Sequence, residues 1–261
     1  MRALIGKRAL VCGASQGIGH ACAVELSKLG ASVTLVARDD TALRQALTAL
    51  CTEGDIAHDY LVADFSDPTV LSQKITAYVQ SRGEVHILVN NTGGPPHGAL
   101  TDAKPEDFLR AFSNHVLCNQ LLVQALLPGM KQAGFGRIIN IISTSVIAPI
   151  RGLGVSNTTR GAVAQWGRTL AAEVAPFGIT VNNVLPGYTA TRRLDALFAA
   201  KAEKQGTTVD AVRQAVIDAI PAKRLADPLE IGAVVAFLAT PAASYVNGVN
   251  LPVDGGRTAA Q

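Results

Sequence analysis

Short apolar runs alternate with longer segments of helical character along most of the chain. In each run nearly every position is apolar and many residues are β-branched, as in strands buried on both faces of a sheet. Short links join these runs to the helical segments, so the pattern predicts an α/β fold of parallel strands and right-handed crossovers. The runs predicted as strands are residues 9–12, 32–37, 60–65, 85–90, 137–143, 178–185 and 248–253.

The segments between the apolar runs have the spacing and the end signals of helices. Asp67 and Pro68, for example, are typical of a helix cap and a first helical turn. Pro128 and Gly129 predict that the last turn of the longest segment is bent or broken. Residues 188–223 lose the strand rhythm and form a polar, helical insertion. The helices are predicted at residues 21–29, 41–50, 68–81, 105–130, 154–174 and 228–239.

Composition narrows the class of protein. A chain of 261 residues with 48% hydrophobic and 16% charged residues can bury the core of one large α/β domain. The net charge of +3 is not concentrated in a Lys/Arg run, so we expect neither a nucleic-acid nor a membrane partner. No run approaches the ~20 apolar residues of a membrane span, and residues 1–8 do not resemble a leader, so we expect a soluble, cytoplasmic protein. The four cysteines have no ligand spacing, which predicts buried thiols and no metal site.

Three glycines lie between the first strand and the first helix. Gly13, Gly17 and Gly19 form a Gly-x-x-x-Gly-x-Gly turn, in which the missing Cβ atoms let a phosphate approach the backbone. The helix N-terminus then offers free N–H groups and the positive end of its dipole to that anion. The turn therefore predicts a dinucleotide site, although a plain strand-to-helix turn also uses glycines.

The end of the second strand indicates which dinucleotide is bound. An NAD site usually has an acidic residue here for the ribose 2′-hydroxyl, whereas this chain has Ala37 followed by Arg38. A guanidinium binds a 2′-phosphate through charge-assisted hydrogen bonds. We therefore predict NADP(H); the alternative is that Arg38 is an ordinary surface arginine.

These motifs and several others resemble the short-chain dehydrogenase/reductase family over nearly the whole chain. Beyond the glycine turn, the resemblance rests on Asp64 after the third strand, Asn90-Asn91-Thr92-Gly93 after the fourth and Ser143 at the end of the fifth. Further matches are Thr180-Val181-Asn182, Pro186-Gly187 with Thr191 beyond them, and Val253-Asp254-Gly255-Gly256.

The resemblance implies a single Rossmann-type domain over residues 1–261, with a doubly wound, seven-stranded parallel sheet. It implies NADP(H) across the carboxyl ends of the strands, a small-molecule substrate, a substrate lid at residues 188–223 and a homo-oligomer, either a tetramer or a dimer. The lid has Arg192 and Arg193 beside apolar residues, which is compatible with an apolar substrate that carries an acidic group. The cofactor-binding residues implied are Gly13, Ser15, Gln16, Gly17, Ile18, Gly19, Arg38, Asp64, Phe65, Asn91, Gly93, Arg160, Pro186, Gly187, Thr189 and Thr191.

The catalytic positions depart from the family pattern of Asn, Ser, Tyr and Lys. Ser143 matches the serine, but counting back from Gly178 places Ser156 at the tyrosine and Arg160 at the lysine. The asparagine position falls on His115, with Asn114 one residue away. The candidate catalytic residues are therefore Ser143, His115 or Asn114, Ser156 and Arg160.

This departure removes the usual acid. A phenol with a pKa of about 10 can be shifted toward neutrality by a nearby lysine, whereas the hydroxyl of Ser156 is far weaker and Arg160 does not shuttle protons. Three replacements are open. His115 titrates at about 6.5 when unperturbed, Tyr188 is a phenol near the expected nicotinamide end, and a conjugated or iminium substrate would need no strong acid from the protein.

A second departure is Cys12, where the family has a threonine whose hydroxyl ties the glycine turn to the Asn-Asn strand. Thr92 is the candidate for supplying that hydroxyl from the other side. Taken together, the residues predict an NADP(H)-dependent oxidoreductase that moves a hydride to or from a small carbonyl-type substrate. The alternative is an NADP(H)-binding sensor or structural protein without turnover; non-redox chemistry with a held cofactor is a third hypothesis.

Overall fold

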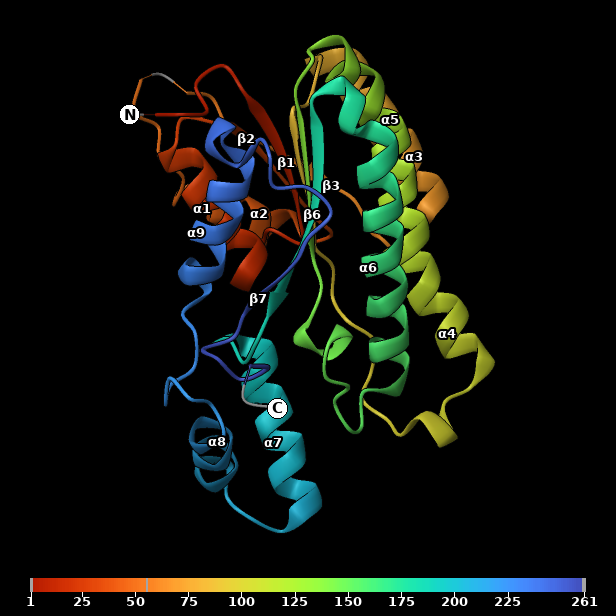
Figure 1. Ribbon diagram of the computed structural model, residues 1–261, viewed down its shortest axis with the longest axis vertical. Coiled ribbons are helices and arrows are strands. Elements are labelled where there is room, and N and C mark those ends of the chain that lie inside the picture. The colour runs from red at the N-terminus through yellow and green to blue at the C-terminus, as the bar shows by residue number, and fades with distance from the viewer. Residues whose placement is uncertain (1, 55, 260–261) are drawn as a thin grey trace.

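The computed structural model describes residues 2–54 and 56–259 and confirms the predicted α/β architecture. Seven parallel strands form one sheet in the order β3-β2-β1-β4-β5-β6-β7 (Figure 1). The order reverses beside β1, which pairs with both β2 and β4. In doubly wound sheets the crevice at such a reversal is where ligands bind. The strands are β1 (Arg8–Cys12), β2 (Ser32–Ala37), β3 (Asp59–Val62), β4 (Ile87–Asn90), β5 (Gly136–Ile141), β6 (Ile179–Pro186) and β7 (Asn250–Val253).

Helices cover both faces of the sheet, which explains why the strands are apolar on both sides. Alternate residues of β1 enter different cores: Ala9 and Val11 pack with α1 and α9, and Leu10 and Cys12 pack with α3 and α5. Figure 1 shows the two helical layers, with α1, α2 and α9 on one side and α3 to α6 on the other. Their bounds are α1 (Gly17–Lys28), α2 (Asp40–Leu47), α3 (Pro68–Arg82), α4 (Pro105–Phe112), α5 (Cys118–Gln132), α6 (Gly154–Val174) and α9 (Pro228–Ala239).

The segment predicted as one helix over residues 105–130 is interrupted, but not where its proline suggested. A π-helical turn, Ser113–Leu117, separates α4 from α5, whereas α5 continues through Pro128 to Gln132. The prediction of a break at Pro128 is therefore wrong. A proline removes one helical hydrogen bond, and here the loss falls in the last turns of α5, which still reaches Gln132. The π turn places His115 in the middle of the long helical segment, and such turns are frequent at functional sites.

Four asparagine side chains form a row across strands β4 to β7. The amide of Asn90 on β4 donates to Asn140 on β5 at 2.9 Å, and Asn140 donates to Asn183 on β6 at 2.8 Å. Asn183 in turn donates to Asn250 on β7, also at 2.8 Å. Each pair is in direct register between neighbouring strands. Gly167 of α6 packs on this row, because a Cβ there would lie 2.8 Å from Asn183 Oδ1.

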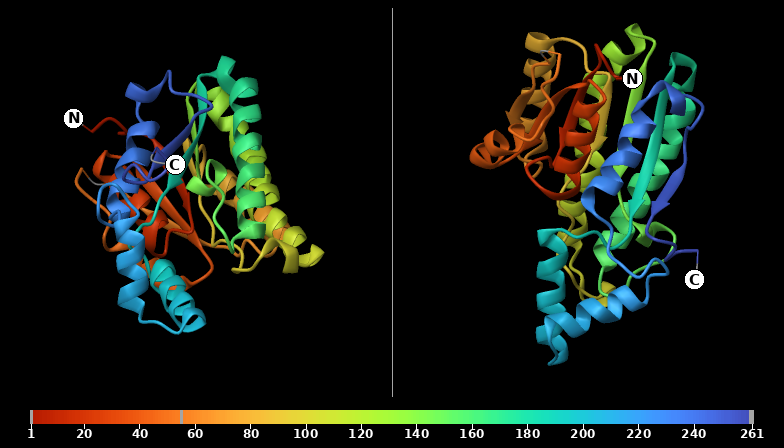
Figure 2. Two further views of the ribbon diagram at one scale, coloured as in Figure 1. Left: turned by 60° about the horizontal axis from the view of Figure 1, so that its bottom comes forward. Right: turned by 90° about the vertical axis from the view of Figure 1, so that its left-hand side faces the viewer.

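Residues 188–223 contain two helices, α7 (Arg192–Gln205) and α8 (Val209–Asp218). They pack around a small core of their own that includes Phe198, Val212 and Ile220. Figure 2 shows that both helices extend beyond the sheet at the carboxyl ends of the strands. Within the described part of the chain, every helix falls short of the length and apolarity that crossing a membrane requires.

Candidate functional site

The glycine turn is held closed by a side chain from the neighbouring strand. The Asn91 amide donates to the carbonyl oxygens of Cys12 and Gly13 at 3.2 and 3.3 Å. A Cβ on Gly13, which has a φ of +59°, would lie 2.6 Å from Asn91 Nδ2, and a Cβ on Gly19 would collide with the Gly13 carbonyl. The missing Cβ atoms therefore serve close backbone packing at both positions.

Asn91, rather than Thr92, makes the connection that Cys12 cannot make through a hydroxyl. Within the part of the chain that the structure describes, the Thr92 hydroxyl forms no hydrogen bond to the turn. The hypothesis of a compensating Cys12 and Thr92 pair is wrong, because the amide of Asn91 already reaches both carbonyls.

The N-terminus of α1 is open to an anion. Its N-cap residue, Gln16, makes no side-chain cap hydrogen bond, whereas Asp39 caps α2 and Asp67 caps α3. Gly17 adopts a φ of +60°, and a Cβ there would lie 3.4 Å from the Thr191 methyl group. The uncapped N–H groups, the dipole and the missing Cβ together fit the diphosphate of a dinucleotide. The predicted residues Ser15 and Ile18 flank this turn and are partly exposed.

The end of β2 presents an exposed cation, Arg38. Asp39 accepts the N-cap hydrogen bond of α2, and Asp40 forms an ion pair with Arg44 at 2.8 Å. Arg38 is exposed and forms no ion pair with the described residues. Its charge, after a hydrogen bond from Ser66, helps to lower the pKa of Asp64, so Arg38 faces the end of β3, where Phe65 is buried.

Pro186 ends β6 and Gly187 follows it, at the carboxyl end of the sheet. The Gly187 N–H donates to the Val253 carbonyl at 2.9 Å, and a Cβ on Gly187 would lie 2.7 Å from Asp254 Cβ. Thr189 is buried and donates back to the Gly187 carbonyl at 3.2 Å. The hydroxyl of Thr191 accepts from the Leu194 N–H as the N-cap of α7.

Ser143 lies two residues beyond the end of β5 and is only partly buried. Its Oγ accepts a hydrogen bond from the Ser145 backbone N–H at 3.1 Å, which fixes the side chain. The hydroxyl proton of Ser143 remains available to a ligand oxygen, because the oxygen acts as the acceptor in that bond.

Ser156 and Arg160 lie one turn apart on α6. Ser156 is buried, and Arg160 donates from Nη1 to the Ile141 carbonyl at 2.8 Å. Burial first, and then the charge of Arg193, lower the pKa of Arg160 to about 10. The guanidinium therefore stays cationic at neutral pH.

His115 and Asn114 face different surroundings. In the orientation that its neighbours require, the Asn114 amide donates to the carbonyls of Phe65 and Arg110 at 3.0 and 3.3 Å. His115 is only 3% exposed, and burial, followed by the charges of Arg160 and Arg193, lowers its pKa to about 2. Of the two, His115 is the residue whose surroundings include Arg160.

The lowered pKa of His115 weighs against this residue as the replacement for the missing acid. A histidine that titrates at about 6.5 could serve as a general acid near neutrality, but a ring held neutral by burial and two guanidinium groups carries no spare proton there. It can still donate or accept one hydrogen bond as a neutral imidazole.

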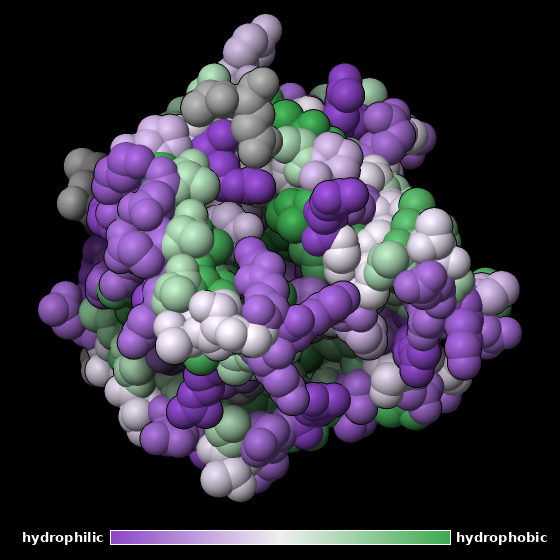
Figure 3. Space-filling model, turned by 90° about the horizontal axis from the view of Figure 1, so that it is seen from below, coloured by the Kyte–Doolittle hydropathy of each residue, from purple (hydrophilic) through white to green (hydrophobic). Residues whose placement is uncertain are grey.

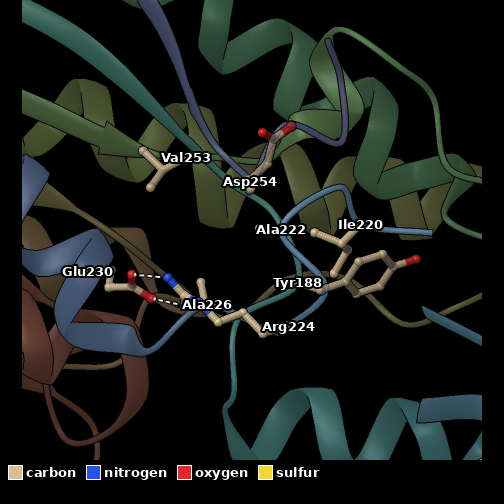
Figure 4. Close-up of a pocket in the computed structure, with 9 residues that line it drawn as sticks. Tyr188, Ile220, Ala222, Arg224, Ala226, Glu230, Val253 and Asp254 are labelled. Atoms are coloured by element: carbon tan, nitrogen blue, oxygen red, sulfur yellow. Dashed lines mark hydrogen bonds and ion pairs between the residues drawn. The ribbon is translucent and has the colours of Figure 1, made fainter. Parts of the chain in front are cut away.

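Tyr188 belongs to a neighbouring cavity. It lines a cavity of about 140 Å³ with Ile220 and Asp254, between the α7–α8 segment and the end of β7. Figure 4 shows the Arg224–Glu230 ion pair on the other side of this cavity. The surroundings of Tyr188 are thus those of a packing residue of α7 and α8. Arg257 lies 5.2 Å from the Tyr188 ring and donates to the Oγ1 of Thr144, the residue after Ser143, at 3.5 Å.

Two arginines, Arg193 and Arg257, make contacts near the site that the sequence pattern did not predict. Arg193 of α7 donates to the Gly94 and Pro95 carbonyls at 3.3 and 3.5 Å, so it bridges the α7–α8 segment to the loop after β4. Arg257 joins the C-terminal turn to Thr144. The signal for Arg193 was its place just after Thr191; nothing in the sequence indicated Arg257.

Figure 3 shows the face below the sheet, where hydrophilic side chains border a hollow with hydrophobic residues at its base.

Comparisons with known proteins show what the chain is similar to. The family described as Enoyl-(Acyl carrier protein) reductase matches residues 13–258. The chain is 34% identical over 255 residues to the 3-oxoacyl-(acyl-carrier-protein) reductase FabG of Vibrio cholerae, covering 97% of this chain and 98% of that protein. It is 32% identical over 253 residues to an uncharacterized oxidoreductase of Mycobacterium tuberculosis, covering 97% and 92%.

A solved structure of similar shape is L-sorbose reductase from Gluconobacter frateurii, complexed with NADPH and L-sorbose. It has a TM-score of 0.91 and 31% identity, and the match covers 99% of both chains.

The candidate site of the present chain combines the glycine turn with a serine hydroxyl, a neutral imidazole and two guanidinium groups. Such groups can bind and stabilise an oxyanion, but none of them is a strong acid near pH 7.

Proposed function

Because the chain belongs to the short-chain dehydrogenase/reductase family and is an oxidoreductase of that type, we propose that it moves a hydride between NADP(H) and a small carbonyl-type substrate. The observation that carries the proposal is the uncapped N-terminus of α1 behind a glycine turn closed by Asn91. The L-sorbose reductase of similar fold was solved in complex with NADPH, which supports the same cofactor here.

The preference for NADP(H) over NAD(H) rests on Arg38. Both neighbouring aspartates are already engaged, Asp39 by the N–H of Ala42 and Asp40 by Arg44. Neither is therefore free to bind a ribose 2′-hydroxyl, and Arg38 can pair with a 2′-phosphate.

The chemistry of the remaining residues favours an acceptor that forms a stabilised anion. Bound NADP(H) supplies or accepts the hydride. Ser143 can donate its hydroxyl proton as a hydrogen bond to the substrate oxygen, and Arg160 adds a positive charge beside it. Ser156 is too weak an acid to replace a phenol, and His115 is neutral. A conjugated enone or an enoyl group needs no strong acid from the protein, because delocalisation stabilises the anion that hydride transfer forms. An iminium ion needs none either, because hydride transfer converts it to a neutral amine.

The test is the oxidation of NADPH by the purified chain with ketones, aldehydes, β-ketoacyl thioesters, imines and conjugated enones. We expect turnover with at least one class, fastest with the conjugated acceptors, and weaker use of NADH. Tight NADPH binding without oxidation by any class would contradict the proposed reaction. Failure to bind NADPH at all would contradict the cofactor site.

We also propose that the chain forms a homo-oligomer in the cytoplasm. Large apolar side chains are exposed on α4 and the π turn, including Leu109, Phe112 and Leu117, which are 71%, 44% and 47% exposed. Apolar residues gathered on one helical face are typical of association surfaces. Light scattering after size-exclusion chromatography tests this; a monomer at micromolar concentration would contradict it.

A further inference from the structure

Two guanidinium groups, those of Arg160 and Arg193, hydrogen-bond to neutral carbonyl groups alone among the described residues. Arg160 donates to the Ile141 carbonyl, and Arg193 donates to the Gly94 and Pro95 carbonyls at distances of 3.3 and 3.5 Å. Within the described ranges, neither forms an ion pair. Six other arginines of the chain do form ion pairs with carboxylates, namely Arg2, Arg44, Arg82, Arg110, Arg213 and Arg224.

The electrostatic surroundings of this pair are positive. Burial lowers the pKa of Arg160 and of His115, and in both cases the charge of Arg193 lowers it further. The pKa of His97 is also lowered, first by burial and then by Arg193. Every charge that shifts these three groups is a cation, so an anion placed among them would be stabilised.

The anions of the cofactor already have other positions. The diphosphate fits the uncapped N-terminus of α1, and the 2′-phosphate fits Arg38. Arg193 instead lies over Gly94, where a Cβ would be 2.5 Å from its Nη2. Gly94 follows Gly93, the last residue of this loop that was predicted to bind the cofactor, and leads to Pro95.

A cavity lies beside Pro95, whose carbonyl accepts a hydrogen bond from Arg193. It has a volume of about 240 Å³, and its lining includes Pro95, Pro96, His97 and Val155, the last of which precedes Ser156. Asp102 and Asp107 also line it, so it would repel the acidic end of a ligand. A molecule with an apolar body in this cavity would therefore direct a carboxylate toward Arg193.

We infer that the substrate of the proposed reaction carries a carboxylate near the carbon that exchanges hydride, and that Arg193 selects for it. The inference rests on the proposed function. Arg193 forms a charge-assisted, two-pronged hydrogen bond with the carboxylate in place of its long bonds to the Gly94 and Pro95 carbonyls. Arg193 is thereby a specificity-determining residue on α7.

The test compares a conjugated enone acid with its neutral counterpart, (E)-5-methyl-4-oxohex-2-enoate and its primary amide, on the protein loaded with NADPH. Binding is followed by isothermal titration, and NADPH oxidation is recorded in parallel. The variants are Arg193→Gln, Arg193→Lys and, as a matched control on the same exposed turn, Arg192→Gln. We expect the acid to bind at least about tenfold more tightly than the amide, and Arg193→Gln to remove most of that difference. Arg193→Lys should restore part of it, and Arg192→Gln should leave it unchanged.

The possible failures are distinguishable. Acid binding that depends on Arg193 without NADPH oxidation would contradict the proposed reaction with this compound but support the carboxylate site. Equal binding of acid and amide, or no binding of either, would overturn the carboxylate site. A loss of NADPH affinity in Arg193→Gln as large as the loss of acid affinity would also overturn it, because Arg193 would then be a cofactor ligand.

Discussion

Arg160 of α6 donates from Nη1 to the backbone carbonyl of Ile141 at 2.8 Å, so the guanidinium is fixed to the end of β5. A lysine has no planar fork and would hold its charge differently at this place. The contact therefore holds the charge of Arg160 at a defined place beside the end of β5.

Arg160→Met removes this contact together with the charge. We expect a loss of about 1 kcal/mol in the free energy of unfolding and at least about tenfold lower kcat/KM with NADPH, because the oxyanion loses its cation. Urea denaturation and steady-state kinetics measure the two effects. Arg168→Met, at an exposed position of the same helix, is the control, and equal kinetics for the two variants would refute the role of Arg160.

His115 should make stability depend on pH. Its pKa is about 2 in the folded chain and about 6.5 when unfolded. The folded state therefore binds fewer protons between these values, so the contribution of His115 is complete above about pH 6.5 and declines as the pH falls toward 2. In the window between pH 4 and 6, we expect His115→Asn to lose stability less steeply than the parent chain, by up to about 1.4 kcal/mol per pH unit. Parallel curves of unfolding free energy against pH would show that the ring is not held neutral.

Arg38 should determine the choice between the two nicotinamide cofactors. Arg38→Gln is expected to weaken NADPH binding by about tenfold or more and to leave NADH binding nearly unchanged, because only NADPH carries the 2′-phosphate. Fluorescence titration with both cofactors gives the ratio. Arg44→Gln is the matched control, since Arg44 is already paired with Asp40; the same ratio in both variants would mean that Arg38 is an ordinary surface residue.

Gly19 should not tolerate even a methyl group. A Cβ there would collide with the Gly13 carbonyl, so Gly19→Ala must displace the turn, and we expect NADPH affinity to fall by at least about tenfold. The control is Gly161→Ala in α6, where a Cβ meets nothing within 4 Å and helix propensity predicts up to about 1 kcal/mol of added stability. Unchanged NADPH affinity in Gly19→Ala would contradict the account of the turn.

The sequence predicted the fold well because its signals were local and repeated. The helices expected at residues 154–174 and 228–239 have the observed bounds. For the second of these, Asp227 and Glu230 form a capping box that marks its start. The strands were recognisable because both faces of the sheet are covered.

The chemistry of the site was harder to predict because it depends on distant partners. The pKa of His115 is lowered first by burial and then by the charges of Arg160 and Arg193, which are far from it in the chain. The π turn that positions His115 leaves no clear mark in the hydrophobic pattern, whereas Pro128 suggested a break that α5 does not have. The surroundings of Tyr188 likewise became clear only once α7 and α8 were placed beside β7.

The row of asparagines across β4 to β7 bears on how this chain reaches its native state. Successive asparagines of the row are 50, 43 and 67 residues apart in the chain. The three hydrogen bonds between their side-chain amides can therefore form only after long segments have come together. A slip of one residue between any two strands would turn an asparagine toward the opposite, apolar face and leave its amide without a partner. The row therefore disfavours compact but mispaired chains, and the alignment of the strands that form the crevice depends on it.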